Sequence, residues 1–440
     1  MSSSSNDPKA RRASTSSINS SSSRNLANIV VEAAASSRNI NRAASNLAQL
    51  RISKTNLHGR DDELKLLRRK LREVATKRSC DGDEQQTSAT NMILVAGKSG
   101  TGKSALIMRG LGDTASRFGY AFAKGKFDQK LQHPLSAFSD AMTNLRRHIQ
   151  KSDCAELIRK DIRKLFDGER REQLRRVLPG CAELFGPSLV KKRRSSAPAI
   201  LSLAQIEWDD LSCSTKDTDI LSSRQNNAAV IGKEAISRTH YAVRRLLKII
   251  CSHLKGVILF IDDLQWSDKA TLNMLSSIVL DKEIPGLLIV GAYREDEVND
   301  HLASYINDLK QMDVPLTQIN VGNLSAEDIT SFIAEALGTD DDDSKVETLA
   351  TVIHRKTDGN PFFVSMFLTS LYDDKILQYN YGSMRWIWDD AAVESRAVTD
   401  NVASVLVNKI NRMKEETQVV LMAASCLGAH FQLFFNCDLY

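Results

Sequence analysis

The segment MILVAGKSGTGKSALIMRGL, at residues 92–111, constrains the fold more than any other part of the chain. It begins with a short apolar run, which is typical of a buried strand, and it ends with a pattern that indicates a helix. Between the two, Gly97, Gly102, Lys103 and Ser104 have the spacing G-x-x-x-x-G-K-[ST]. Glycines allow the tight turn in which backbone N–H groups converge on phosphate oxygens, and the helix N-terminus adds further donors. The segment therefore predicts a strand, a phosphate-binding loop and a helix in succession.

This loop is expected to hold the phosphates of a nucleotide together with Mg²⁺. The Lys103 ammonium has the reach to contact the β- and γ-phosphates, and the Ser104 hydroxyl is suited to ligate Mg²⁺. An ordinary glycine-rich turn is the alternative interpretation. The candidate nucleotide-binding residues of the loop are Gly97, Lys98, Ser99, Gly100, Thr101, Gly102, Lys103 and Ser104.

A second apolar run, GVILFIDD at residues 256–263, supplies the acidic groups that such a loop needs. Asp262 is the candidate Mg²⁺ ligand, because a carboxylate at the end of a buried strand beside the loop can hold the metal shell. Asp263 is the candidate catalytic carboxylate that orients or activates water. A buried strand that ends in a solvated acidic turn is the alternative.

The order of these motifs favours ATP over GTP. One further strand candidate, at residues 120–127, lies between the loop and the acidic pair in the sequence, which is the order expected of ATPases. No N-K-x-D motif for guanine recognition is present in the chain.

Strand and helix patterns alternate through the central part of the chain. Strands are expected at 92–97, 120–127, 256–263, 286–294 and 316–322, with helical patterns between them. This alternation predicts an α/β fold, namely a P-loop NTPase parallel sheet with helices on both faces. From Ser325 onward the pattern is helical, and a serine followed by acidic residues marks the first helix start.

Composition excludes several classes of protein. A net charge of +5, from 59 basic and 54 acidic residues, is too balanced for a dedicated nucleic-acid binder. Seven scattered cysteines without a CxxC pair argue against a disulfide framework or a structural zinc site, and they fit a reducing compartment. No uninterrupted apolar run reaches the length of a membrane span. The serine- and arginine-rich start is typical of a disordered tail, and an organellar transit peptide is the alternative.

Six short motifs carry a resemblance to a known family. In chain order they are LHGRDDEL, GKSGTGKS, GKFDQ, LFIDDLQWSD, VGAYR and TDGNPFF. Together they resemble the STAND class of AAA+-related signalling ATPases, especially the origin-recognition-like ATPase module of large microbial and algal regulators. The resemblance spans about residues 55–435. It implies that a helical lid follows the P-loop core and that a winged helix begins near Val398.

Four regions are expected on this basis. They are a disordered serine-rich tail at 1–50, a P-loop ATPase core at 51–322, a helical lid at 323–395 and an incomplete winged-helix-like region at 396–440. A polar stretch at about 186–230 is expected to be a poorly ordered insertion in the core. Because the last region stops short of a finished domain, a fragment of a longer multidomain protein is one interpretation of the chain.

Some candidate binding residues come from the resemblance alone. It implies that the first motif lies against the adenine and ribose, here around His58, Gly59 and Arg60. A simple helix entry would also explain these three residues. The resemblance further implies that Pro361 contacts the adenine from the lid, although proline also suits the first turn of any helix.

The resemblance also assigns a γ-phosphate contact to Arg294, which ends the fourth expected strand. A guanidinium suits this role because it stays charged and donates hydrogen bonds in a fork, so Arg294 is a candidate catalytic residue. A surface salt bridge with Glu295 or Asp296 is the alternative. Trp266, which follows the acidic pair, is expected to be packed rather than functional.

The resemblance implies an ATP-dependent signalling switch, with ATP and Mg²⁺ bound between core and lid. Hydrolysis is expected to be slow, because a single arginine near the γ-phosphate is identifiable. A DNA-associated AAA+ ATPase of the origin-recognition or initiator type is the alternative, and a nucleotide-binding scaffold without hydrolysis is a third reading. Expected partners are ATP or ADP and other proteins or further copies of the chain, while DNA has no support here. A cytoplasmic location is expected, with nuclear and organellar ones as alternatives.

Overall fold

The computed structural model describes residues 50–52, 55–79, 91–129, 134–187, 222–281, 284–312, 314–339, 344–396, 407, 410–411 and 413–427. The chain divides into two compact units. The first, here called the sheet unit, contains Gly59–Asn323 together with Asn360–Phe362. The second, the helical unit, contains the described residues up to His58, Leu324–Gly359 and those from Phe363 onward. The expected core began at residue 51 and ended at 322, so the structure differs in assigning residues before Gly59 to the helical unit and Asn360–Phe362 to the sheet unit.

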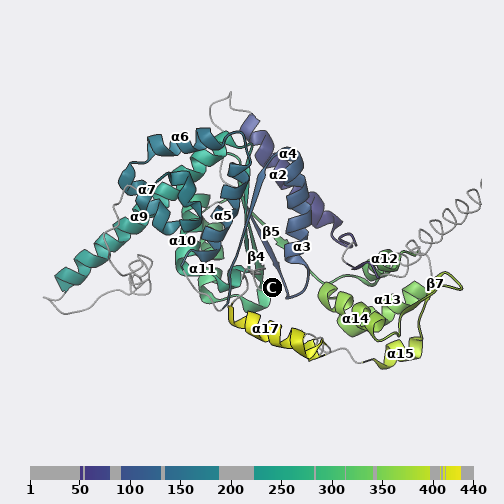
Figure 1. Cartoon of the computed structure of the whole chain (residues 1–440). Helices are drawn as coiled ribbons and strands as arrows, with labels where there is room; N and C mark the ends of the chain where they lie inside the picture. Colours follow the sequence, from purple (N-terminus) through teal and green to yellow (C-terminus); the bar gives the residue numbers. More distant parts are fainter. Residues whose placement is uncertain are drawn as a thin grey trace, which may run out of the picture. The chain divides into compact units, whose positions relative to one another are not determined.

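The sheet unit is built on a five-stranded sheet (Figure 1). Its order is β2 (Ala121–Lys126), β3 (Val257–Asp262), β4 (Leu287–Arg294), β1 (Asn91–Gly97) and β5 (Leu316–Asn320). Every neighbouring pair is parallel. The side chains of β1 and β3 are buried throughout, as expected for strands covered on both faces. The predicted α/β fold with a parallel sheet is confirmed.

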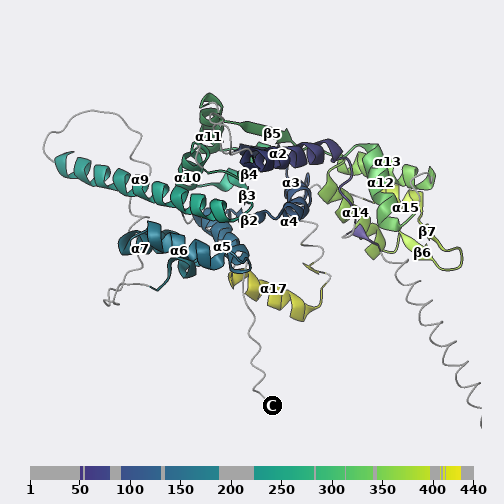
Figure 2. The same ribbon diagram turned by 90° about the horizontal axis from the view of Figure 1, so that it is seen from above.

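Helices cover both faces of this sheet (Figures 1 and 2). One layer contains α2 (Asp61–Ser79), α3 (Lys103–Ile107), the π-helical turn η2 (Met108–Gly112) and α4 (Asp113–Phe118). The opposite layer contains α5 (Ser136–Gln150), α9 (Ser222–His253), α10 (Lys269–Val279) and α11 (Asp300–Gln311). Three shorter elements, α6 (Ala155–Leu165), α7 (Gly168–Val177) and the 3-10 helix η3 (Pro179–Phe185), pack beside α5 and α9.

Strand order brings three separate parts of the sequence to one edge of the sheet. In the sheet, β4 lies between β1 and β3. In the sequence, by contrast, the strand that comes between β1 and β3 is β2. The register pairs Gly97 at the end of β1 with Arg294 at the end of β4, and Lys126 of β2 with Asp262 of β3. Because all strands run parallel, their carboxyl ends meet at the same edge, where ligands of open α/β sheets bind.

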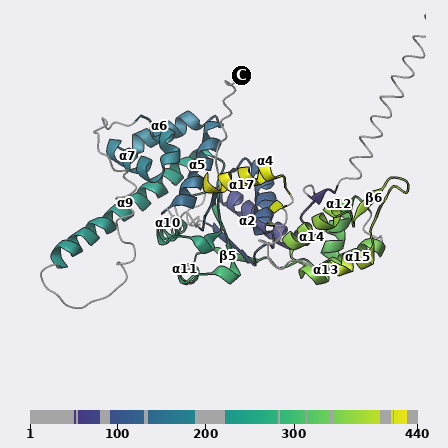
Figure 3. The same cartoon turned by 60° about the horizontal axis from the view of Figure 1, so that its bottom comes forward.

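The helical unit has its own apolar core. It contains α12 (Ala326–Leu337), α13 (Ser344–Thr357), α14 (Pro361–Asp373) from Phe363 onward, a hairpin of β6 (Gln378–Asn380) and β7 (Arg385–Ile387), and α15 (Asp390–Ser395). Figure 3 shows these elements grouped together. α12 begins with a reciprocal capping box between Ser325 and Asp328, as its sequence predicts. Trp386 of β7 is buried and donates its indole N–H to the carbonyl of Leu337, which fixes the hairpin against α12.

Several expectations fall partly outside the described residues. These are the tail, most of the polar insertion and most of the region from 396 onward, in which α17 (Glu415–Leu427) is the one described helix. The insertion was expected to extend to about residue 230, whereas α9 begins at Ser222. Within the described residues, no helix is long and apolar enough to cross a membrane.

Candidate nucleotide-binding site

The loop between β1 and α3 has the backbone geometry that its glycines predict. Gly97, Gly100 and Gly102 all have positive φ angles, of 155°, 80° and 89°. A side chain is excluded at Gly97 by contact as well, since a Cβ there would lie 2.3 Å from the main-chain oxygen of Val321. Gly102 forms the N-cap of α3, so the first N–H groups of this helix open into the loop. The loop is therefore shaped to present backbone donors to an anion.

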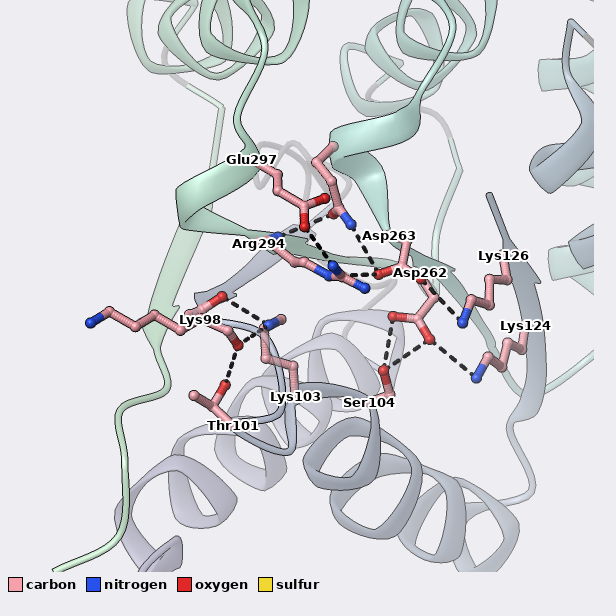
Figure 4. A network of polar contacts seen from close by, with 12 residues as sticks. Lys98, Thr101, Lys103, Ser104, Lys124, Lys126, Asp262, Asp263, Arg294 and Glu297 are labelled. Atoms are coloured by element: carbon pink, nitrogen blue, oxygen red, sulfur yellow. Dashed lines mark hydrogen bonds and ion pairs between the residues drawn. The ribbon is translucent and has the colours of Figure 1, made fainter. Parts of the chain in front are cut away.

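Lys103 places its ammonium inside the loop. Its Nζ donates to the carbonyl oxygens of Gly97 at 2.8 Å and Lys98 at 2.7 Å, and the residue is buried. Burial and, secondly, the nearby positive charge of Arg294 lower the pKa of Lys103. Figure 4 shows the Lys103 side chain turned into the loop, whereas that of Lys98 points away from it. Both hydrogen-bond acceptors of the ammonium are neutral carbonyls and no residue of the loop is acidic, so an anionic phosphate would supply a counter-charge inside the loop.

Ser104 and Asp262 meet at the first turn of α3. The Ser104 hydroxyl lies 2.9 Å from both carboxylate oxygens of Asp262. The Asp262 carboxylate is almost fully buried at the end of β3, and Lys124 of β2 approaches it at 3.2 Å. A hydroxyl and a carboxylate are hard oxygen donors of the kind that Mg²⁺ takes, usually one or two from protein with water and phosphate oxygens for the rest. These two residues fit a Mg²⁺ ion, even though no cluster of three or more His, Cys, Asp or Glu exists in the described part of the chain.

Asp263 adopts a left-handed backbone conformation, with φ 58°. Aspartate tolerates this region better than most residues do, and here it directs the chain out of β3 into the short 3-10 turn η5 (Leu264–Trp266). The Asp263 carboxylate accepts a hydrogen bond from Gln265 at 3.1 Å and forms an ion pair with Lys126 at 3.2 Å. The Nε of Arg294 lies 4.0 Å from the same carboxylate (Figure 4).

Arg294 lies beside the phosphate loop, since its register partner is Gly97. Its guanidinium pairs with Glu297 at 2.5 Å and stacks over the Trp266 ring, 5.0 Å from the centroid. The sequence suggested Glu295 or Asp296 as its salt-bridge partner, but the 3-10 turn η6 (Glu295–Glu297) brings Glu297 to it instead. Trp266 packs against the core, as expected, and also supports this arginine by a cation–π contact.

Arg60 lies behind the phosphate loop. It is buried and donates to the main-chain oxygens of Thr101, at 3.3 Å, and Gly322, while Glu63 pairs with it at 3.5 Å. Gly59 forms the turn before α2, with φ 63°. In the helical unit, His58 lies 2.6 Å from Glu335 of α12. The geometry thus links Arg60 to the loop backbone, and its contact with adenine or ribose stays a prediction.

The motif GNPF also reaches the phosphate loop. Asn360 donates its amide to the carbonyl of Ser99 at 2.9 Å, and the Phe362 N–H donates to the carbonyl of Gly100 at 3.3 Å. A Cβ on Gly100 would lie 2.6 Å from the Asn360 side-chain oxygen, so this approach needs glycine. Pro361 is the first residue of α14, where proline fits the helix start.

Sequence reasoning missed four polar residues of this site. Lys124 and Lys126 are two apart on β2, so they share one face of the strand, and the stretch KGKF at residues 124–127 was the available signal. Gln265 and Asn360 belong to the motifs LFIDDLQWSD and TDGNPFF, but neither motif predicted the contacts that these two side chains make. The residues that sequence reasoning did select, Lys103, Ser104, Asp262, Asp263 and Arg294, lie together at the carboxyl ends of β1, β3 and β4.

A phosphate loop with a buried lysine, a serine–aspartate pair and a second carboxylate defines a P-loop nucleotide-binding site. Residues 56–290, more than half of the chain, match the AAA ATPase domain family. The chain belongs to this family, and membership implies a nucleotide-binding ATPase domain.

Two curated relatives are similar to parts of the chain. One is "Hybrid signal transduction histidine kinase G" of Dictyostelium discoideum, 30% identical over 148 residues, which are 33% of this chain and 4% of that protein. The other is "Peroxide stress-activated histidine kinase mak3" of Schizosaccharomyces pombe, 23% identical over an alignment of 435 residues that covers 85% of this chain and 17% of that protein. The chain thus spans only a small part of the length of either relative.

Two archaeal proteins are among the solved structures that a structural comparison matches to this chain. The ORC2 protein of Aeropyrum pernix, in its ADPNP–ADP complexes, has a TM-score of 0.43 and 12% identity, covering 86% of this chain and 79% of its own. A Walker-type ATPase of Pyrococcus abyssi has a TM-score of 0.34 and 11% identity, with the same two coverages of 86% and 79%.

Proposed function

We propose that the chain is a Mg²⁺-dependent ATP hydrolase of the STAND class, whose nucleotide state acts as a signalling switch. The observation that carries the proposal is the joint position of Lys103, Ser104 and Asp262 at the phosphate loop, with Asp263 next to them. These groups supply a cation for phosphate, two oxygen donors for a metal ion and, in Asp263, a second carboxylate for water. A glycine-rich turn without a ligand would require none of them.

Each residue has a distinct role in this proposal. Backbone N–H groups of the loop and the Lys103 ammonium bind the phosphates, while Ser104 and Asp262 would hold Mg²⁺. Bound Mg²⁺ would neutralise the charge that develops on the phosphate oxygens. Asp263 orients the attacking water and accepts its proton. Arg294 donates to the γ-phosphate from the end of β4, which requires its guanidinium to exchange Glu297 for the nucleotide.

Slow turnover is part of the proposal. In the described residues, Arg294 is the one arginine with an ion-pair distance to Asp263, and the guanidinium of Arg60 is directed to backbone carbonyls. An additional arginine from a partner protein or a further copy of the chain would accelerate hydrolysis by about 10³- to 10⁵-fold in related chemistry. Adenine and ribose contacts are proposed for Gly59, Arg60 and Pro361.

The route from the nucleotide to the helical unit is proposed to run through α14. Asn360 and Phe362 hydrogen-bond to the phosphate loop, and the rest of this helix contributes Val364, Phe367 and Leu368 to the helical core. Because α14 begins in one unit and continues in the other, a change in the loop is proposed to pass along it. A ligand shifts such an equilibrium only if it binds the two states with different affinity, so the γ-phosphate must make the difference between ATP and ADP.

Both relatives are named as histidine kinases, which supports a place for the chain in signalling. Because the chain spans only 4% and 17% of them, we infer an ATPase module of a larger signalling protein, with protein partners or self-association as its output. A cytoplasmic location is proposed with it.

Replacing Arg294 by alanine is expected to remove most of the preference for ATP over ADP. Only ATP offers this guanidinium a γ-phosphate, and a charge-assisted hydrogen bond contributes about 1.5–3 kcal/mol, or about ten- to hundredfold in affinity. Isothermal titration with ATP and ADP, both with Mg²⁺, measures the two dissociation constants. Arg117→Ala, an exposed arginine on α4, is the matched control and should keep the wild-type ratio. Equal weakening of both nucleotides by Arg294→Ala would remove the γ-phosphate role.

A further inference from the structure

The turn that follows the acidic pair contains a buried glutamine with three hydrogen-bond partners, two at its side-chain amide and one at its main-chain oxygen. Gln265 is only 2% exposed. Its Nε2 donates to Asp263 Oδ1 at 3.1 Å, and its Oε1 accepts from the main-chain N–H of Arg294 at 3.1 Å. Its main-chain oxygen accepts from the side chain of Asn299 at 2.9 Å, and Asn299 is the N-cap of α11. Gln265 therefore joins the end of β3 to the end of β4 and to the start of α11.

The orientation of this amide follows from its partners. A main-chain N–H can only donate, so the side-chain oxygen of Gln265 must face Arg294. The NH₂ group is then left for Asp263, which as a carboxylate can only accept. Reversing the amide would break both hydrogen bonds at once and leave buried polar groups unpaired. The arrangement is thus specific for glutamine rather than for any polar side chain.

Gln265 is the most firmly placed of the groups that touch Asp263. Lys126 pairs with the carboxylate at 3.2 Å, but its side chain is 58% exposed, and exposed ion pairs contribute little, about 0–1 kcal/mol. Arg294 lies at 4.0 Å and has Glu297 as a closer partner. The Gln265 amide is buried, so water does not compete for it as it does for Lys126, and among the described residues its NH₂ group donates to Asp263 alone.

We propose that Gln265 is a positioning residue, which fixes the position of the Asp263 carboxylate relative to Arg294. Asp263 leaves β3 in a left-handed conformation, so the strand ladder does not fix its side chain. The hydrogen bond from Gln265 replaces that restraint, and its second hydrogen bond ties the same amide to the residue that faces the γ-phosphate. The inference rests on the proposed hydrolysis, in which Asp263 orients water and Arg294 contacts the γ-phosphate.

Gln265→Glu is the sharpest test, because glutamate has the same shape and keeps the acceptor for Arg294. The group facing Asp263 becomes a carboxylate oxygen, so a donor is lost and a like charge is added. We expect kcat to fall by about ten- to hundredfold, since displacement of a catalytic group by about 1 Å costs rates of this order. KM for ATP should stay within about threefold, because Lys103 and Ser104 are untouched. Gln311→Glu, the same change on the exposed surface of α11, should leave both constants unchanged.

A double variant separates positioning from general damage. If Gln265 acts through Asp263, Gln265→Glu should add almost no loss in an Asp263→Asn background, where the catalytic carboxylate is already absent. Gln265→Leu, similar in volume and uncharged, is measured in parallel, and thermal melting identifies which variants are folded. If Gln265→Glu lowered kcat by the same factor in both backgrounds, or if a folded Gln265 variant kept the wild-type kcat, the inference would be overturned and the proposed function would stand. Turnover of the wild-type chain that does not depend on Asp263 would overturn the proposed function as well.

Discussion

Lys103→Ala is expected to weaken ATP binding by about a hundredfold or more while the fold is kept. The ammonium lies inside the phosphate loop, and two carbonyl oxygens already orient it. Loss of a buried charged donor to phosphate costs about 3 kcal/mol, which is about a hundredfold in the dissociation constant. The loop itself should persist, because its turns depend on glycines at 97, 100 and 102 rather than on this side chain. Isothermal titration of MgATP into the wild-type and variant chains measures the effect.

Lys310→Ala is the matched control for that experiment. Lys310 is exposed on α11, away from the loop, and its removal changes the net charge by the same amount. A thermal melt of each variant reports whether the fold is intact. If Lys103→Ala were folded and bound MgATP as the wild type does, the loop from Gly97 to Ser104 would not be the nucleotide site.

Asp263→Asn is expected to leave MgATP bound and to stop turnover. Removal of a general base lowers rates by about 10²- to 10⁴-fold, whereas Ser104 and Asp262 remain to hold the metal ion. Asparagine keeps the size of the side chain, can still accept the hydrogen bond from Gln265 and tolerates the left-handed backbone of this position. Steady-state phosphate release gives the turnover, and a parallel titration gives the affinity.

Asp308→Asn, an exposed aspartate of α11, serves as the control and should release phosphate at the wild-type rate. Unaltered phosphate release by Asp263→Asn would assign the catalytic carboxylate to another residue. A joint loss of binding and turnover would instead place Asp263 among the groups that hold the nucleotide.

The central part of the fold could be predicted because its signals are local. Glycines between a strand pattern and a helix pattern predict the phosphate loop. An apolar run that stops at Asp262 predicts the acidic pair at a strand end. The order of the strands in the sheet depends on tertiary packing, so the sequence did not predict which strand ends lie next to one another. Only the placement of β2 beside β3 brings Lys126 to the acidic pair, and only the placement of β4 between β1 and β3 brings Arg294 to Gly97.

Other misses have equally physical reasons. The sequence SSRQNNAAV at the start of α9 has no apolar stripe, so it was assigned to the polar insertion expected at about 186–230, although α9 begins at Ser222. Gln265 and Asn360 make contacts whose partners lie across the sheet edge or 261 positions apart in sequence. A polar residue in a turn has no periodicity that would reveal such a partner. Only the folded chain shows that they are buried.

Limited proteolysis in three nucleotide states tests the central claim most directly. The chain is incubated with MgATP, MgADP or no nucleotide, and cleavage within about residues 325–395 is followed over time. ATP is expected to slow this cleavage more than ADP does, because the γ-phosphate alters the loop to which Asn360 and Phe362 are bonded and α14 continues into the helical unit. Identical cleavage in all three states would contradict the account and leave ATP as a ligand without a switching role.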